Sequence, residues 1–188
     1  MDDLLCDIKA CTLCKEHLPL GPNPVVQGSL ESKIVIIGQA PGKIVHETSI
    51  PWNDKSGDNL RSWLGVDRDT FYDPAKIALV PMGFCYPGRG KSGDLPPRPE
   101  CAPLWHPKLL TFMEEVEFTI LVGNYAQSYY LQEKQNLTDT VRAYQKYLPD
   151  YFPLPHPSPR NNIWQAKNPW FKQEVLPALQ ERVAEVLG

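Results

Sequence analysis

The sequence lacks an excess of basic residues, which counts mildly against nucleic-acid binding, and it lacks any long apolar run, which excludes a membrane-spanning protein. Its 188 residues carry a formal net charge of −3, so no global positive field draws the chain to nucleic acid, although a local basic cluster would suffice. No apolar stretch approaches the length needed to cross a membrane, and the acidic opening Met1-Asp-Asp3 does not look like a secretory signal. We therefore expect a cytoplasmic protein with no membrane partner.

The chain has five cysteines and an unusual number of prolines. In a cytoplasmic protein the five cysteines should be reduced, metal-bound or catalytic, and not paired in disulfides. The 20 prolines gather at the ends of segments and in two clusters, 95–99 and 152–159, which is typical of rigid, shaped loops. A chain of this length suits one compact unit, and we assign residues 1–188 to a single domain.

An alternation of strand and helix patterns sets the expected fold class. Four short runs rich in apolar and β-branched residues are typical of strands: 33–38, 76–81, 118–123 and, more weakly, 150–155. Helical patterns of apolar residues lie between and after them, at 58–64, 107–117, 125–131 and 170–187. The sequence therefore predicts an α/β protein, a three-layer α/β/α sandwich around a central four-stranded parallel sheet.

Two motifs follow expected strands at their carboxyl ends, where parallel sheets bind ligands. Gly38-Gln-Ala-Pro-Gly42 makes a rigid turn whose backbone N–H groups can face a ligand, with an ordinary tight turn as the alternative. His156-Pro-Ser-Pro-Arg-Asn161 holds a histidine between prolines. Its fixed backbone suits a side chain that stabilises charge at a set place, although a lone histidine is more often satisfied within a loop.

These two motifs, in this order, resemble the signature motifs of the uracil-DNA glycosylase superfamily. The second motif, with Gln165-Ala-Lys-Asn168, is most similar to the single-strand-selective monofunctional uracil glycosylases, whereas the first is closer to the family-4 iron–sulfur enzymes. The similarity spans roughly residues 11–172 and includes segments 50–57 and 123–131. It implies a uracil-DNA glycosylase-like fold and a monofunctional enzyme of base excision repair, which hydrolyses the N-glycosidic bond of uracil or a related deaminated base in DNA.

The resemblance also implies roles for the matching residues. The catalytic pair would be His156, which hydrogen-bonds the carbonyl oxygen of the departing base, and Gln39, whose backbone amide assists it. The residues expected to bind the base are Ala40, Pro41, Trp52 and Met82. The Trp52 ring would stack on the base face, although a buried aromatic beside a proline is also ordinary core.

A loop over 157–168 is expected to face DNA, since basic and aromatic residues follow the second motif directly. The residues expected to contact DNA are Ser158, Arg160, Asn161 and Lys167. Ile163 or Trp164 would act as a wedge into the vacated base stack. An ordinary solvated loop is the alternative for this segment.

Two departures from the family pattern bear on activity and substrate. Gln39 and Ala40 occupy motif positions where family members usually carry an acid or an asparagine, and Gln can orient water but cannot take its proton. Three nearby carboxylates could substitute for the missing acid, although each also suits a surface or capping role: Glu47, Asp54 and Asp58. Pro81 and Met82 replace an asparagine that reads the uracil edge, so hypoxanthine or xanthine is an alternative substrate.

Four of the cysteines are candidate metal ligands. Cys11 and Cys14 form a C-x2-C pair, and Cys85 and Cys101 flank a loop rich in Gly and Pro. This order resembles the ligands of family-4 enzymes and implies a [4Fe–4S] cluster, with a structural zinc on the same four thiolates as the alternative. Either would clip the N-terminal segment to the loop. Cys6 stands outside this set.

Two other functions remain open at this stage. The first is a catalytically weak or inactive module that binds modified bases or nucleic acid, because the first motif lacks its acid. The second, a bifunctional enzyme with Lys91 or Lys167 as a Schiff-base nucleophile, has little support because nothing near either lysine indicates a lowered pKa. In the leading interpretation the partner is DNA containing a deaminated base, and we expect the protein to be a monomer.

Overall fold

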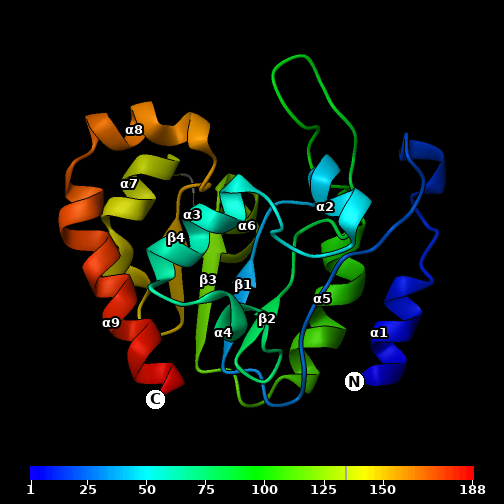
Figure 1. The fold of residues 1–188 in the computed structure, drawn as a ribbon, viewed down its shortest axis with the longest axis horizontal. Coiled ribbons are helices and arrows are strands. Elements are labelled where there is room, and N and C mark those ends of the chain that lie inside the picture. The colour runs from blue at the N-terminus through cyan, green and yellow to red at the C-terminus, as the bar shows by residue number, and fades with distance from the viewer. Residues whose placement is uncertain (134) are drawn as a thin grey trace.

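The centre of the molecule is a sheet of four parallel strands (Figure 1). The structure is a computed structural model and describes residues 1–133 and 135–188. The strands lie in the order β2-β1-β3-β4, and their bounds are β1 (Ile34–Ile37), β2 (Ile77–Leu79), β3 (Phe118–Val122) and β4 (Tyr151–Leu154). All four runs predicted from the sequence are therefore confirmed as strands, and Pro153 lies on the edge strand β4, where a missing N–H is tolerated.

Helices connect the strands and surround the sheet. The α-helices are α1 (Asp2–Lys9), α2 (Lys43–Thr48), α3 (Lys55–Leu64), α4 (Arg68–Tyr72), α5 (Cys101–Phe112), α6 (Asn124–Leu131), α7 (Leu137–Arg142), α8 (Asn162–Lys167) and α9 (Leu176–Leu187). Shorter turns are η1 (Lys15–His17), η2 (Tyr144–Tyr147), η3 (Pro159–Asn161) and the π-helical η4 (Phe171–Val175). Polar side chains start several of them: Asp54 accepts a hydrogen bond from the Gly57 N–H at 2.9 Å and so begins α3.

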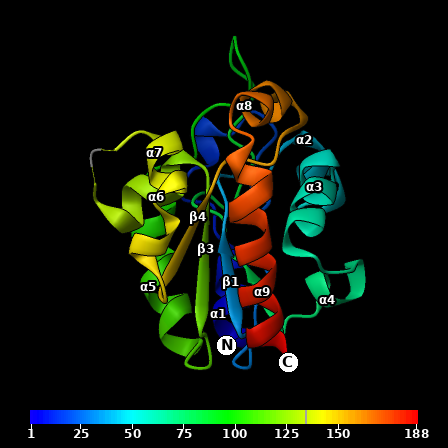
Figure 2. The same cartoon turned by 90° about the vertical axis from the view of Figure 1, so that its left-hand side faces the viewer.

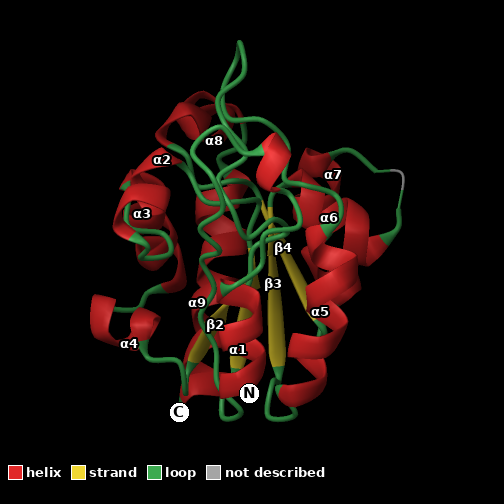
Figure 3. Ribbon diagram, turned by 90° about the vertical axis from the view of Figure 1, so that its right-hand side faces the viewer, coloured by secondary structure: helices red, strands yellow, loops and turns green. Residues whose placement is uncertain are grey.

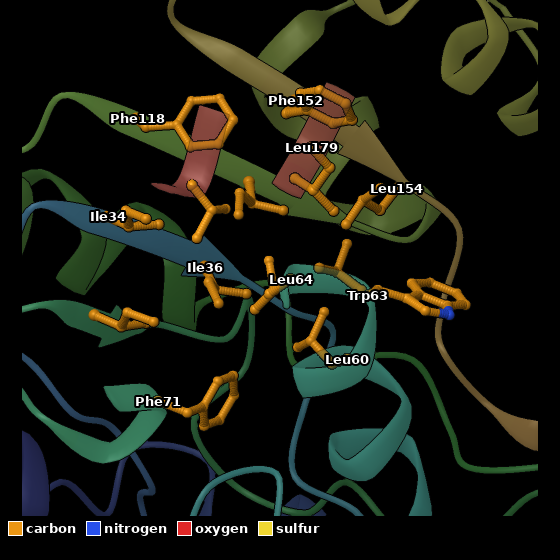
Figure 4. Close-up of a cluster of buried hydrophobic side chains, with 14 of the residues drawn as sticks. Ile34, Ile36, Leu60, Trp63, Leu64, Phe71, Phe118, Phe152, Leu154 and Leu179 are labelled. Carbon is orange, nitrogen blue, oxygen red and sulfur yellow. The ribbon is translucent and has the colours of Figure 1, made fainter. Parts of the chain in front are cut away.

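Both faces of the sheet are buried under helices, as Figures 2 and 3 show. In β1, Ile34 and Ile36 point to one face and Val35 and Ile37 to the other. The first face packs against α3, α4 and α9, and Figure 4 labels side chains from both its strands and these helices. The second face packs against α1, α5 and α6. The predicted three-layer α/β/α sandwich is confirmed, because strands that are apolar on both faces need a helical layer on each side.

The helix expected over 107–117 begins and ends earlier in the chain. It is α5, which begins at Cys101 and ends at Phe112, so that Pro107 is inside the helix and not at its start. Ala102, Trp105 and Leu109 all pack into the second core cluster, and this burial outweighs the preference of proline for a helix start. The remaining helical patterns are confirmed as α3, α6 and the η4–α9 segment.

The carboxyl ends of β1 and β3 mark the point where the order of the strands reverses, because β2 lies on one side of β1 and β3 on the other. Open parallel sheets bind their ligands at such a point. The segments after all four strands, together with α8 and the long loop between β2 and α5, gather at this end of the sheet (Figure 1). Within the described residues, no helix combines the length and apolarity required to cross a membrane.

Candidate active site

A cavity of about 430 Å³ opens at the carboxyl ends of the strands and brings the two sequence motifs together. This volume lies within the range of small-molecule sites. Its walls come from the first motif, the segment before α3, the end of β2, the loop between β2 and α5, and the second motif. The lining residues used below are Gly38, Gln39, Ala40, Pro41, Gly42, Trp52, Asp54, Pro81, Arg89, Asp94, His156, Ser158 and Arg160.

The ring of His156 has a defined orientation and tautomer. Its Nδ1 accepts a hydrogen bond from the Ser158 N–H at 3.2 Å, which places the ring proton on Nε2. Burial holds the pKa of His156 below its ordinary value, and the opposing effect of Asp54 is smaller. The ring is therefore neutral near neutral pH, and its Nε2–H is a hydrogen-bond donor for a ligand in the cavity.

Two asparagines hold the backbone around this histidine. Asn161 donates its amide to the His156 carbonyl, so its side chain fixes the motif here, and its contact with DNA stays a prediction. Asn59, on α3, donates to the Pro157 carbonyl at 2.8 Å. Sequence reasoning missed Asn59, because it is nearly a hundred residues from its partner in the chain. Both bonds restrict the loop that aims the histidine.

Trp52 lies beside His156, with the ring centroids 5.9 Å apart. Its backbone is in the left-handed region, with φ of 55°, and the buried Arg61 donates to its carbonyl at 3.3 Å. The indole covers Gly38, where an added Cβ would lie 2.7 Å from the ring. The first motif therefore begins with glycine because the aromatic ring occupies the space of a side chain. This position of Trp52, on the wall of the cavity, suits stacking on a bound base.

Replacing Gly57 with alanine should disturb Trp52. An added Cβ would lie 1.7 Å from the Trp52 carbonyl oxygen, so either α3 or the tryptophan must move. Alanine inside a helix normally stabilises it by about 0.5–1 kcal/mol relative to glycine, whereas overpacking costs about 1–3 kcal/mol. We expect the cost of overpacking to exceed the gain in helix stability. The free energy of unfolding in urea should therefore fall by roughly 1–2 kcal/mol.

The matched control is Ser62→Ala, an exposed position on the same helix. It should leave the free energy of unfolding within about 0.5 kcal/mol of the wild type. A Gly57→Ala variant as stable as this control would show that the contact with Trp52 does not constrain the helix.

The first motif is tied to the end of β2. The N–H groups of Met82 and Gly83 donate to the carbonyls of Gly38 and Gln39 at 2.8 and 3.0 Å. Met82 itself is 7% exposed and packs in the second core cluster, and its neighbour Pro81 lines the cavity in its place, so the contact of Met82 with the base stays a prediction. The reason for this burial is the alternation of side chains at a strand end, which turns Met82 toward α5.

The carboxylates near the first motif separate into two groups. Glu47 pairs with Lys43, and Asp58 accepts from Arg61 at 2.6 Å, so both have structural partners. Asp54, in contrast, lines the cavity and uses only its Oδ1 to begin α3. Asp94 also lines the cavity, although it is far from either motif in the sequence and no local signal singled it out.

The segment after the second motif is not the loop that the sequence suggested, because residues 159–161 form η3 and α8 follows at once. Ile163 is 70% exposed, whereas Trp164 is partly buried and donates its Nε1–H to Thr138 at 2.9 Å. Of the two candidate wedges, only Ile163 is therefore presented to solvent. Lys167 is exposed at the end of α8, and Arg160 lines the cavity and donates to the Ser92 carbonyl at 3.4 Å.

Four cysteines line a second, small cavity between the N-terminal segment and the start of α5: Cys11, Cys14, Cys85 and Cys101. Apolar side chains, among them Phe84 and Trp105, enclose it, and burial raises the pKa of both Cys85 and Cys101 to about 11. A donor set of four thiols around one apolar cavity fits the cluster that the sequence predicts. Over residues 1–133 and 135–188, no group of three or more metal-binding side chains is arranged for a single ion.

Fold and site together define the class of protein, an α/β/α sandwich with a fixed histidine, an aromatic ring and carboxylates around a cavity at the carboxyl ends of its strands. The family model of the uracil DNA glycosylase superfamily matches residues 25–180. The chain belongs to this superfamily, and the resemblance found in its motifs is confirmed. Membership assigns it a DNA glycosylase activity, a hydrolysis of the bond between base and sugar, with DNA as the substrate.

Proposed function

We propose that this protein is a monofunctional glycosylase that removes uracil or a related deaminated base from DNA. The observation that carries the proposal is the pairing of a neutral His156, with its free Nε2–H donor, and Trp52 on the wall of one cavity. A base flipped out of the stack needs an aromatic face to lie on and a donor for its carbonyl oxygen. This cavity supplies both from a rigid scaffold.

Negative charge develops on the departing base as the glycosidic bond breaks. The Nε2–H of His156 is placed to stabilise that charge at a base carbonyl oxygen, assisted by the backbone N–H groups of Gln39 and Ala40. Because the ring is held by Ser158 and Asn161, it needs little reorganisation during the reaction. Gln39 orients water, and the Asp54 carboxylate at the same cavity can accept a proton, which the glutamine cannot.

Contact with DNA is proposed around the mouth of the cavity. Arg160 and Lys167 would bind phosphates, Ser158 would assist them from the cavity wall, and the exposed Ile163 at the start of α8 would enter the space left by the flipped base. The net charge of the chain is negative, so affinity should depend on these few local cations. The wedge is the branched aliphatic side chain and not the neighbouring tryptophan.

An excision assay identifies the base that the protein removes. Pro81 lines the cavity at the end of β2, and a proline cannot read a base edge through a side-chain hydrogen bond. We expect excision of uracil, with hypoxanthine and xanthine as the alternatives. Anaerobically purified protein is incubated with labelled single- and double-stranded oligonucleotides carrying each base or only normal bases, followed by alkaline cleavage of abasic sites.

Abasic product from at least one deaminated base, and none from the normal oligonucleotide, supports the proposal. Measurable binding without abasic product would favour a binding module, the second candidate that the missing acid in the first motif motivates. Strand breaks before the alkaline step would show lyase chemistry in place of simple hydrolysis.

We also propose that the four cysteines hold a [4Fe–4S] cluster. The support is their position around one cavity, which they reach from the N-terminal segment and from the two ends of the loop between β2 and α5. When bound, such a cluster would act as a structural cross-link between these segments. Structural zinc on the same thiolates remains the alternative. Nothing in the hydrolytic step described above depends on either metal.

A further inference from the structure

The cavity holds two side chains that can act as a base toward water. Among its described lining residues, the Gln39 amide cannot take a proton, the His156 Nε2 already carries one, and Arg89 and Arg160 are cations. The carboxylates of Asp54 and Asp94 are left. Asp94 has no counterpart in either sequence motif, and it belongs to the loop between β2 and α5.

We propose that Asp94 is a second catalytic carboxylate, which accepts the proton of the attacking water beside the acid-free first motif. The proposal rests on the proposed glycosylase function and adds a group to its active site.

The position of Gly42 shows how closely the two carboxylates approach the first motif. A Cβ added to this last residue of the motif would lie 3.6 Å from the Oδ2 of Asp94 and 3.9 Å from the Oδ2 of Asp54. Both acids therefore converge on the same point, which the absent side chain leaves open. The turn that lacks an acid in its own sequence thus has two carboxylates from other segments next to it.

Asp94 is held there by an ordered hairpin, residues 88–95. The Leu95 N–H donates to the Gly88 carbonyl at 2.8 Å, and Arg89 and Asp94 form an antiparallel bridge. This 88–95 hairpin belongs to the loop that projects beyond the strand ends in Figure 1. The bond from Arg160 to the Ser92 carbonyl ties it to the second motif. Asp94 is therefore presented by backbone bonds and is not a chance surface residue.

The electrostatic setting of Asp94 suits a base. The residue is exposed, yet partial burial of its carboxyl in the cavity raises its pKa above the ordinary value. Arg89 and Arg160 oppose this shift, and Asp54 acts in the same direction as burial. A carboxylate whose pKa is moved toward the working pH is a more effective proton acceptor.

The proposed hydrolysis needs no reactant other than water. The C1′–N bond breaks and its electron pair leaves with the base, whose carbonyl oxygen accepts a hydrogen bond from His156. The water oxygen forms the new bond to C1′, and its proton passes to Asp94 and then to solvent. The base anion takes a proton from solvent after release.

The test is single-turnover excision with saturating protein, on whichever oligonucleotide the wild type cleaves in the assay above. Asp94→Asn and Asp94→Ala should lower the rate about 10–100-fold, which is less than the full effect of proton transfer because Asp54 remains. The control is Asp69→Asn, which removes the same charge from an exposed position in the first turn of α4 and should stay within about twofold. Affinity for the oligonucleotide, measured by fluorescence anisotropy, should not weaken in either Asp94 variant.

The pH dependence separates a catalytic from a structural role. The wild-type rate should fall as the pH drops through the raised pKa of Asp94, because the protonated carboxyl cannot accept a proton. That fall should be absent or shifted in Asp94→Asn, whereas a loosened hairpin would lower the rate equally at every pH. An active wild type with unchanged Asp94 variants, or variants with an unaltered pH profile, overturns this inference alone. An inactive wild type overturns the proposed function and the role of Asp94 with it.

Discussion

The His156→Ala variant should excise its base about 10²–10³-fold more slowly than the wild type, the cost of removing one preorganised donor to a developing oxyanion. The neutral ring offers a single donor, Nε2–H, since Nδ1 is already occupied by the Ser158 N–H. In the proposed mechanism, loss of the ring removes this donor from the leaving base. The measurement is the single-turnover rate with saturating protein, on the oligonucleotide that the wild type cleaves.

The control for this effect is His156→Gln, because a glutamine amide can carry an N–H toward the place of Nε2. We expect it to recover part of the lost rate, about tenfold over the alanine variant. The melting temperatures of all three proteins should agree within a few degrees, since His156 lies at a cavity wall and not in either core cluster. A His156→Ala rate within about twofold of the wild type would exclude the histidine from the chemistry.

Replacement of Cys101 by serine should remove the bound metal and lower the thermal stability. A cross-link that closes a long loop contributes about 3–5 kcal/mol to the free energy of unfolding. For a protein of this size, that corresponds to a fall of roughly 6–20 °C in melting temperature. Iron and sulfide analysis, visible absorbance and calorimetry of anaerobically purified protein measure the effect, and we expect about four irons per wild-type chain.

Cys6 provides a matched control within the same chain. It is exposed on α1 and lies outside the cavity formed by the other four cysteines. Cys6→Ser should keep the iron, the absorbance and the melting temperature of the wild type. A colourless wild-type protein with one zinc would contradict the cluster and favour the zinc site, and iron retained in Cys101→Ser would remove this residue from the ligand set.

The fold could be predicted from the sequence because its signals are local. Each strand is a short apolar run, and β1 and β3 are apolar on both faces, which requires a helical layer on each side. The start of α5 could not be predicted in this way. A proline at position 107 indicates a helix start by its backbone preference, but burial of Trp105 and Leu109 against the sheet extends the helix back to Cys101.

The candidate site was predictable where a motif follows a strand. The two motifs meet in one cavity because the carboxyl ends of β1 and β4 lie at the same edge of a parallel sheet. The directions of single side chains were less predictable. Met82 turns into the core, Asn161 bonds to its own motif, and Trp164 is held by Thr138, because alternation and local hydrogen bonds decide orientation.

The sequence by itself determined the layers of this protein, the two motifs at its strand ends and the family to which they point. Only the tertiary structure decided which carboxylates lie beside the first motif. Asp54 and Asp94 come from separate segments and converge beside Gly42 through a helix start and the 88–95 hairpin. Contacts of this kind join residues far apart in the chain, so they depend on packing and leave no local pattern in the sequence.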